Sequence, residues 1–131
     1  MERQPAGEAN AVAAAVVDAA FKVHSALGPG LLESVYRLCL HEELSSRGYA
    51  ARKEVPLPIR YGRLLLDGGL RLDLLVNDVV VVELKAVEHL LPVHDAQLLT
   101  YLKLSGKELG LLINFNVPLI KNGIRRRVLS V

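Results

Sequence analysis

The chain has 131 residues, with 16 Lys and Arg against 14 Asp and Glu, which gives a formal net charge of +2. That length suits one domain, residues 1–131, with a substantial core, and the small net charge excludes attraction of nucleic acid by the field of the whole molecule. Hydrophobic residues make up 51% of the sequence, yet charges or turn residues interrupt every apolar run, which excludes a membrane span. The apolar surplus therefore predicts a dense core and leaves room for a subunit interface.

The single cysteine, Cys39, excludes an internal disulfide framework and fits a reducing compartment. The first ten residues lack the basic start and apolar core of a signal peptide. We therefore expect a cytoplasmic protein in which residues 1–7 form a disordered lead-in.

Two helices are expected first. Between residues 8 and 27 the apolar positions recur at spacings of three and four, at Val12, Val16, Ala19, Ala20 and Val23. Gly28-Pro29-Gly30 ends this helix, and a second helix follows over residues 31–47, with Gly48 as its C-terminal cap. The apolar stripe of the second helix comprises Leu32, Val35, Tyr36, Cys39, Leu40 and Leu44.

The next part of the chain has β character. Residues 49–60 contain Pro56 and Pro58, which suit an edge strand or its end, and residues 61–63 form a turn. A further strand begins at Leu64, is interrupted by a bulge or loop at residues 67–69, and continues over residues 70–76. Strict alternation would place Leu70, Leu72, Leu74 and Val76 on one face and Arg71, Asp73 and Leu75 on the other.

The central strand is expected over residues 79–87, where an apolar run ends in Glu83, Leu84 and Lys85. Asn77-Asp78 separates this strand from the preceding one, so a hairpin brings Asp73 near Glu83 and Lys85. Charged groups beside a core cost free energy unless they are paired or bind a ligand. Two carboxylates and a lysine at this place suggest a divalent-metal site for phosphate chemistry.

The chain is expected to end with a helix over residues 94–105, a buried strand over 109–114, a loop and a final strand over 124–131. A strand, helix and strand in succession imply a crossover connection and at least one parallel pair. The predicted fold class is α/β, with a mixed β-sheet flanked by helices.

Residues 30–36, GLLESVY, match the signature GxxExxY. Together with the segments RLDLLV, VVELKAVEHLLPVHDAQLLTYLK and GLLINF, the chain from His24 to Arg127 resembles the GxxExxY protein family, which is grouped with the PD-(D/E)xK nuclease superfamily. The resemblance implies a restriction-endonuclease-like core of order αβββαβ, with an extra N-terminal helix.

The resemblance also implies a complete set of catalytic residues. The acid of the first core helix corresponds to Glu33, the acid of the second strand to Asp73, and the E-x-K of the third strand to Glu83 and Lys85. The Gln-xxx-Tyr pair on the following helix corresponds to Gln97 and Tyr101. The implied activity is a nuclease acting on nucleic acid, with DNA favoured.

Mg²⁺ (or Mn²⁺) is the expected cofactor because it prefers oxygen ligands, commonly one or two carboxylates with water and phosphate. Asp73 and Glu83 supply the carboxylates, the backbone carbonyl of Leu84 a further oxygen, and Glu33 a contact through water. The small size and high apolar content favour a homodimer or an unidentified protein partner.

Other interpretations of the same residues stay open. Asp73 and Lys85 suit a structural ion pair across the hairpin, and Glu33 suits a salt bridge with Arg37 at helical spacing. With such pairs, the chain would be a catalytically weak or inactive nuclease-fold protein that binds nucleic acid or another protein.

Single residues outside this set also have structural interpretations. Tyr36 suits a core aromatic with a hydrogen-bonded hydroxyl, His94 a helix cap or core histidine bordering the site, and His24 a structural residue. The basic stretch KNGIRRRV suits phosphate contacts or the protection of an edge strand, and the sequence favours neither.

Overall fold

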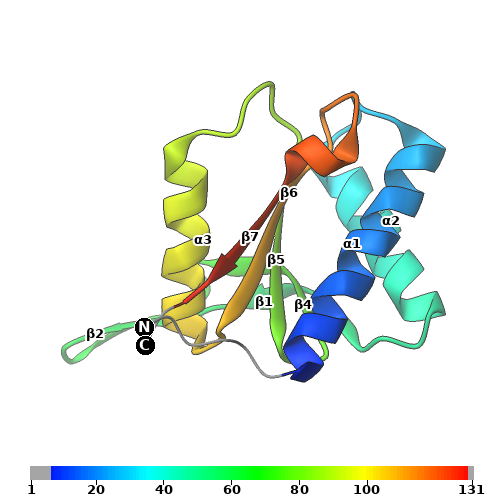
Figure 1. The fold of residues 1–131 in the computed structure, drawn as a ribbon. Helices are drawn as coiled ribbons and strands as arrows, with labels where there is room; N and C mark the ends of the chain where they lie inside the picture. The colour runs from blue at the N-terminus through cyan, green and yellow to red at the C-terminus, as the bar shows by residue number, and fades with distance from the viewer. Residues whose placement is uncertain (1–6, 130–131) are drawn as a thin grey trace.

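The structure, a computed structural model, describes residues 7–129 and is built around a five-stranded sheet with helices on both faces (Figure 1). The helices are α1 (Gly7–Leu27), α2 (Glu33–Ser46), α3 (Pro92–Ser105) and the short 3-10 helix η1 (Ile120–Gly123). The strands are β1 (Ala51–Pro56), β2 (Ile59–Tyr61), β3 (Leu64–Leu66), β4 (Arg71–Val76), β5 (Val80–Lys85), β6 (Leu109–Asn114) and β7 (Ile124–Val128).

The sheet has the strand order β1-β4-β5-β6-β7 and is mixed, as predicted. The β5–β6 pair is parallel and is joined through α3, while the other pairs are antiparallel. β5 lies in the middle and all of its residues before Lys85 are buried, which explains its near-continuous apolar sequence. The hairpin of β4 and β5 turns at Asn77 and Asp78, whose φ angles of 50° and 57° are those of a tight hairpin turn.

Two apolar cores lie on the two faces of the sheet. α1 and α2 cover one face, where the alternating residues of β4, β5 and β6 meet the predicted stripe of α1 and the buried residues of α2. α3 covers the other face through Leu98, Tyr101 and Leu102. It packs closely on β6 because Gly110 has no side chain: a Cβ there would stand 2.8 Å from Leu98.

Two of the predicted strands are each divided in the structure. Residues 49–60 form β1 and β2, and residues 64–76 form β3 and β4. The interruption expected at residues 67–69 is therefore a loop between two strands and not a bulge within one. β2 and β3 pair only with each other. The hydrogen bond from Leu57 N–H to the Leu70 carbonyl (2.9 Å) lies between the β1–β4 ladder and this pair, and the next residue, Pro58, has no N–H to donate.

The strict alternation expected along β4 is also wrong. Leu74 and Val76 face the α1–α2 side, but Leu72 joins Leu75 in the core under α3. The change of face falls at Asp73, which is missing from the ladder with β1, and the residue opposite it, Glu54, has a φ of 51°. Backbone pairing is therefore interrupted at this point on both strands.

Smaller differences concern the ends of elements. α3 begins at Pro92, two residues before the expected start, because proline is tolerated in a first helical turn. Leu32 precedes α2 and is 73% exposed, so it does not join the apolar stripe. Gly7 belongs to α1, while residues 1–6 of the expected lead-in and the end of the final strand, 130–131, lie outside the described residues. None of the described helices is long and apolar enough to cross a membrane.

Tyr36 is a core aromatic, as one interpretation of the sequence predicted. Its buried ring stacks on Phe115 with centroids 4.5 Å apart. Its hydroxyl donates to the Gly28 carbonyl (2.6 Å) and accepts from the Leu31 N–H (3.1 Å). The side chain thus fixes the turn between α1 and α2 and determines where α2 begins.

We expect Tyr36→Phe to lower the free energy of unfolding by about 1–2 kcal/mol, because two backbone groups lose a partner while the ring packing stays. Urea unfolding monitored by circular dichroism measures this change. Tyr61→Phe is the matched control, since Tyr61 is 80% exposed and should tolerate the loss. Equal stability of the two variants would contradict the role assigned to the Tyr36 hydroxyl.

Candidate active site

The two acids of the predicted hairpin make direct contact at the point where the β4–β5 ladder stops. The Asp73 N–H donates to Glu83 Oε1 (3.2 Å), and the Leu84 N–H donates to Asp73 Oδ2 (2.8 Å). Regular pairing of the two strands extends only from Leu74 and Val82 toward the turn. Side-chain bonds therefore replace backbone bonds here and hold both carboxyl groups beside the end of β5.

Glu83 is buried, with 5% of its surface exposed. Burial, followed by the charge of Asp73, raises the pKa of Glu83 to about 9. In the absence of a cation, Glu83 therefore keeps its proton at neutral pH. A cation bound beside Glu83 would oppose this rise in the pKa of Glu83.

Arg37 of α2 provides the counter-charge for Asp73. Its Nη1 lies 3.4 Å from Asp73 Oδ1, and its Nη2 lies 3.5 Å from Glu54 Oε1. Among the described residues, neither an Asp73–Lys85 pair nor a Glu33–Arg37 pair is formed, so both expected ion pairs are replaced by these contacts. Sequence reasoning considered Arg37 only as a partner of Glu33 and missed its position at the site.

Glu33 stands in the first turn of α2 and is half-buried. Burial raises the pKa of Glu33, the charge of Asp73 raises it further, and Lys85 and Arg37 partly oppose the shift. These effects place Glu33 within electrostatic range of Asp73 and Lys85. The structure thus brings the first predicted acid toward the same end of the sheet.

α3 contributes the other side of the site. Gln97 Nε2 donates to the Tyr101 hydroxyl (2.9 Å), so the two predicted residues form a pair one helical turn apart. Burial raises the pKa of Tyr101, and the charges of Glu83 and Asp73 add to the shift. A cavity of about 530 Å³ lies along this part of α3 and is lined by Lys85, His94, Gln97 and Tyr101, among others.

The two histidines discussed above have different positions. His94 Nδ1 accepts from the Leu91 N–H (2.9 Å), so His94 caps the start of α3 while it lines the cavity, as predicted. His24 is buried and its Nε2 lies 2.8 Å from the Val117 carbonyl oxygen, which confirms a structural residue.

Asn114 is a supporting residue that sequence reasoning missed. Its side chain accepts from the Val87 N–H (3.1 Å) and donates to the Val87 carbonyl (2.9 Å). The Phe115 N–H also donates to the Lys85 carbonyl (3.0 Å). These bonds fix the chain as it leaves β5, just after Lys85. The only signal in the sequence was a polar residue at the end of an apolar strand.

The C-terminal arginines are engaged within the molecule. Arg125 Nη1 and Arg127 Nη2 lie 2.7 Å and 2.8 Å from the two carboxylate oxygens of Asp95 on α3. Arg126 contacts Asn10 of α1. Since β7 is an edge strand, these contacts favour the structural interpretation of the basic stretch over phosphate binding.

The site suits a hard cation with few protein ligands. Among residues 7–129, no three His, Cys, Asp or Glu side chains form a metal-binding group. Asp73 and Glu83 nevertheless place two carboxyl groups together, and Mg²⁺ is commonly held by one or two carboxylates while water and phosphate complete its shell. A cation would offset the negative charge of the two neighbouring carboxyl groups, which burial makes costly at Glu83.

Glu83→Gln should stabilise the metal-free protein at alkaline pH. Above about pH 5, an unfolded chain, in which Glu has a pKa of 4.5, has lost the proton that Glu83 keeps in the folded protein. The free energy of unfolding of the wild type therefore falls as pH rises from about 5 to 9. Gln does not titrate, so the variant should lack this part of the decline. Its free energy of unfolding should exceed that of the wild type by on the order of 2 kcal/mol at pH 8.

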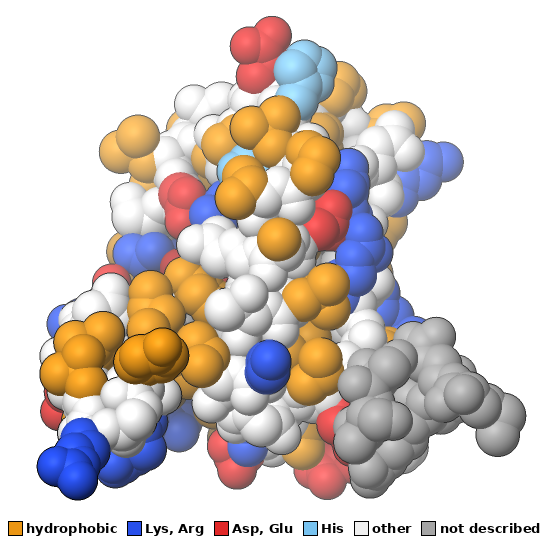
Figure 2. Space-filling model, turned by 90° about the vertical axis from the view of Figure 1, so that its left-hand side faces the viewer, with side chains coloured by type: hydrophobic (Ala, Val, Ile, Leu, Met, Phe, Trp, Pro, Cys, Tyr) orange, Lys and Arg blue, Asp and Glu red, His pale blue; other side chains and the backbone are white. Residues whose placement is uncertain are grey.

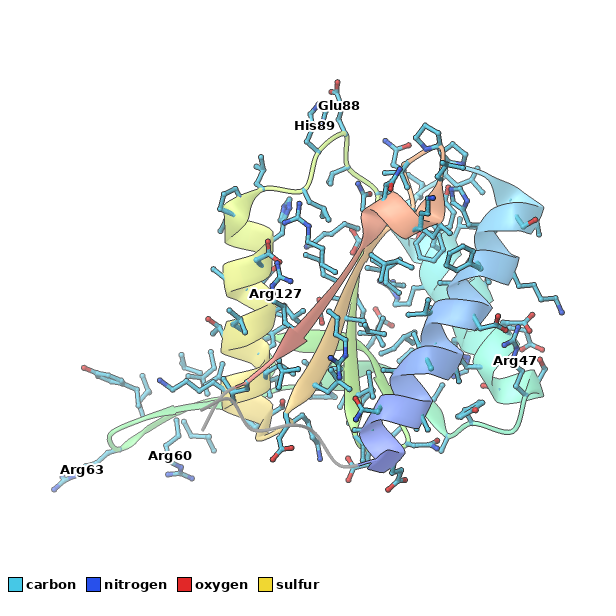
Figure 3. The ribbon with its side chains drawn as sticks, viewed as in Figure 1. Arg47, Arg60, Arg63, Glu88, His89 and Arg127 are labelled. Atoms are coloured by element: carbon cyan, nitrogen blue, oxygen red, sulfur yellow. The ribbon has the colours of Figure 1, made fainter. Side chains whose placement is uncertain are left out.

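Urea unfolding in EDTA between pH 5 and 9 measures this difference. Glu88→Gln, in the exposed connection after β5 (Figure 3), is the matched control and should follow the wild type. Parallel curves for wild type and Glu83→Gln would contradict the raised pKa.

Comparisons with known proteins identify the fold and the superfamily of this chain. A search of curated proteins finds no match. The crystal structure of SSO0001 matches with a TM-score of 0.51 and 24% identity, over 75% of this chain and 50% of that chain, which supports the fold alone. The chain thus spans half the length of that protein, and the restriction-endonuclease-like fold is confirmed. The narrower resemblance to the GxxExxY family stays a prediction. A family model described as the PD-(D/E)XK nuclease superfamily matches residues 10–127, nearly the whole sequence, and the chain therefore belongs to that superfamily.

Proposed function

We propose that this protein is a Mg²⁺- or Mn²⁺-dependent nuclease that hydrolyses phosphodiester bonds in DNA. One observation carries the proposal. Asp73, bonded to Glu83 and to the backbone of Leu84, lies beside the end of β5, where Lys85 lines a cavity together with residues of α3. Membership of a nuclease superfamily makes phosphodiester hydrolysis the chemistry that this arrangement best serves.

Asp73, Glu83 and the Leu84 carbonyl would hold the cation, with Glu33 in contact through water. When bound, the cation would polarise the phosphodiester and lower the pKa of water at the site. Its charge would also favour loss of the proton from Glu83, whose pKa is raised in the metal-free protein. Metal binding is therefore expected to tighten as the pH rises.

Lys85 would orient the attacking water or neutralise negative charge that develops on the phosphate. In the reaction, the water oxygen bonds to phosphorus, one phosphorus–ester oxygen bond breaks, and the leaving oxygen takes a proton. The Gln97–Tyr101 pair faces the same cavity and would position the sugar-phosphate backbone through hydrogen bonds. Arg37 would limit the repulsion between Asp73 and an approaching phosphate.

Lys85→Ala should reduce the cleavage rate by roughly 10²-fold or more, because the charge beside the phosphate is lost while the carboxylates remain. Cleavage of labelled single-stranded, duplex and branched DNA and of RNA, with Mg²⁺ or Mn²⁺ and with EDTA, measures this rate. Lys22→Ala on α1, where Lys22 pairs with Glu43, is the matched control and should keep full activity. Undiminished cleavage by Lys85→Ala would mean that another site or a contaminating enzyme is responsible.

Mg²⁺ should raise the melting temperature of the wild type by about 10 °C at 100 times its dissociation constant. Asp73→Asn should remove most of this increase, because it replaces an anionic ligand with a neutral one. Titration calorimetry with MgCl₂ gives the binding directly. The metal proposal fails if neither method detects binding to the wild type. Binding of metal and DNA without turnover would instead support the alternative of an inactive binding module.

A further inference from the structure

The β2–β3 hairpin, residues 59–66, is an arm that projects from the molecule beyond α3 (Figure 1). Every residue from Arg60 to Gly69 is exposed. The exposed fractions of Tyr61, Leu64, Leu65 and Leu66 are 80%, 53%, 50% and 48%. A two-stranded hairpin of this length has little stability of its own, so an arm with leucines on both faces suggests a surface that a partner covers.

The arm and the residues that flank it also carry an excess of basic side chains. Residues 52–71 contain five basic and two acidic residues, although the whole chain has a net charge of only +2. One of the two acids, Glu54, is paired with Arg37. Among the described residues, Arg60 and Arg63 form no ion pair, and both extend into solvent from the arm (Figure 3).

The pairing of the strands gives the arm two different faces. Ile59 pairs with Leu66 and Tyr61 pairs with Leu64, so one face is apolar. Arg60 pairs with Leu65 on the other face, and Arg63 lies in the turn after Gly62. Figure 2 shows hydrophobic side chains gathered beside basic ones at the lower left, where the arm lies.

We propose that this arm binds the groove and backbone of duplex DNA next to the cleavage site, with Arg60 and Arg63 on phosphates. The inference rests on the proposed nuclease function. A two-stranded ribbon fits the major groove of B-form DNA, which is about 12 Å wide, whereas the deep and narrow major groove of duplex RNA excludes it. Aliphatic side chains on such a ribbon can contact thymine methyl groups or base steps.

The short chain segment between the arm and the active site supports the binding of one duplex across both. β3 continues through residues 67–70 into β4, which carries Asp73. At roughly 3.3 Å per residue, the ten residues from Arg63 to Asp73 span at most about 33 Å, which is close to one turn of B-form DNA. A duplex whose scissile phosphate lies at Lys85 therefore has its flank within reach of the arm.

A second copy of the chain is a less suitable partner for the arm than DNA. A symmetric dimer through the apolar face would leave Arg60, on the opposite face, and Arg63, in the turn, without compensation of their charge. Asp67 is the one acid between Arg60 and Arg71. Phosphates, in contrast, complement this charge. Charge complementarity thus selects DNA over self-association.

The test measures binding of a labelled 30-base-pair DNA duplex by fluorescence anisotropy, in EDTA so that no strand is cut. The variant is Arg60→Gln/Arg63→Gln, and the control is Lys22→Gln/Lys121→Gln, which removes two charges near α1 and η1. We expect the arm variant to bind at least 10-fold more weakly and to lose about two units of the salt-dependence slope. The control should match the wild type.

Kinetics supply a second readout. If the arm only binds the flank, Arg60→Gln/Arg63→Gln should raise KM for duplex DNA and leave kcat unchanged, with little effect on single-stranded DNA. Suppose that the wild type binds and cleaves DNA and that the arm variant binds DNA equally tightly. This result would overturn the inference and leave the proposed function intact. A wild type that neither binds nor cleaves would overturn both.

Analytical ultracentrifugation tests whether the arm binds a second copy of the chain instead of DNA. A dimeric wild type that becomes monomeric in Leu64→Ser/Leu66→Ser, with unchanged DNA affinity, would assign the arm to self-association and overturn the inference. A monomeric wild type whose DNA affinity falls in the same leucine variant supports it. Circular dichroism confirms that each variant is folded before its affinity is compared.

Discussion

The contact between Asp73 and Glu83 is the constraint on which the site and much of the sheet geometry depend. The Asp73 amide bonds to the Glu83 side chain, and the Asp73 side chain bonds to the Leu84 amide, so the backbone ladder stops there. The strand then changes face, which turns Leu72 toward α3 while Leu74 stays toward α1 and α2. The interruption of the β4–β5 ladder at the two carboxyl groups thus also turns the start of β4, and the arm before it, toward the α3 side.

The placement of buried Glu83 beside partly buried Asp73 is tolerated because three separate effects lower its cost. Glu83 holds a proton, Asp73 faces Arg37, and two backbone amides satisfy carboxyl oxygens. Arg37 comes from the helix that also carries Glu33, and the start of that helix is fixed by the Tyr36 hydroxyl. The GxxExxY signature therefore combines different tasks: Gly30 belongs to a turn with positive φ, Glu33 approaches the site, and Tyr36 holds the turn in place.

Local sequence patterns predicted the helices and the central hairpin well because these depend on neighbours in the chain. The stripe of α1, the cap at Gly106 and the turn at Asn77-Asp78 are of this kind. The Asp73–Arg37 pair and the change of face at Asp73 were not predictable, since they depend on contacts between elements far apart in sequence. Asn114 was missed for the same reason: its partner is Val87, 27 residues earlier.

The small net charge of the chain does not conflict with a nucleic-acid substrate, because the charges are unevenly distributed. Arg125 and Arg127 pair with Asp95, and Arg47 pairs with Asp18 and Glu43, so many basic side chains serve the fold. Arg60 and Arg63 instead lie on a projecting arm. At physiological ionic strength, fields are screened within about 8 Å, so a phosphate responds to the charges beside it and not to the sum over the chain. A nearly neutral protein can therefore bind nucleic acid through one basic arm, as we propose for this chain.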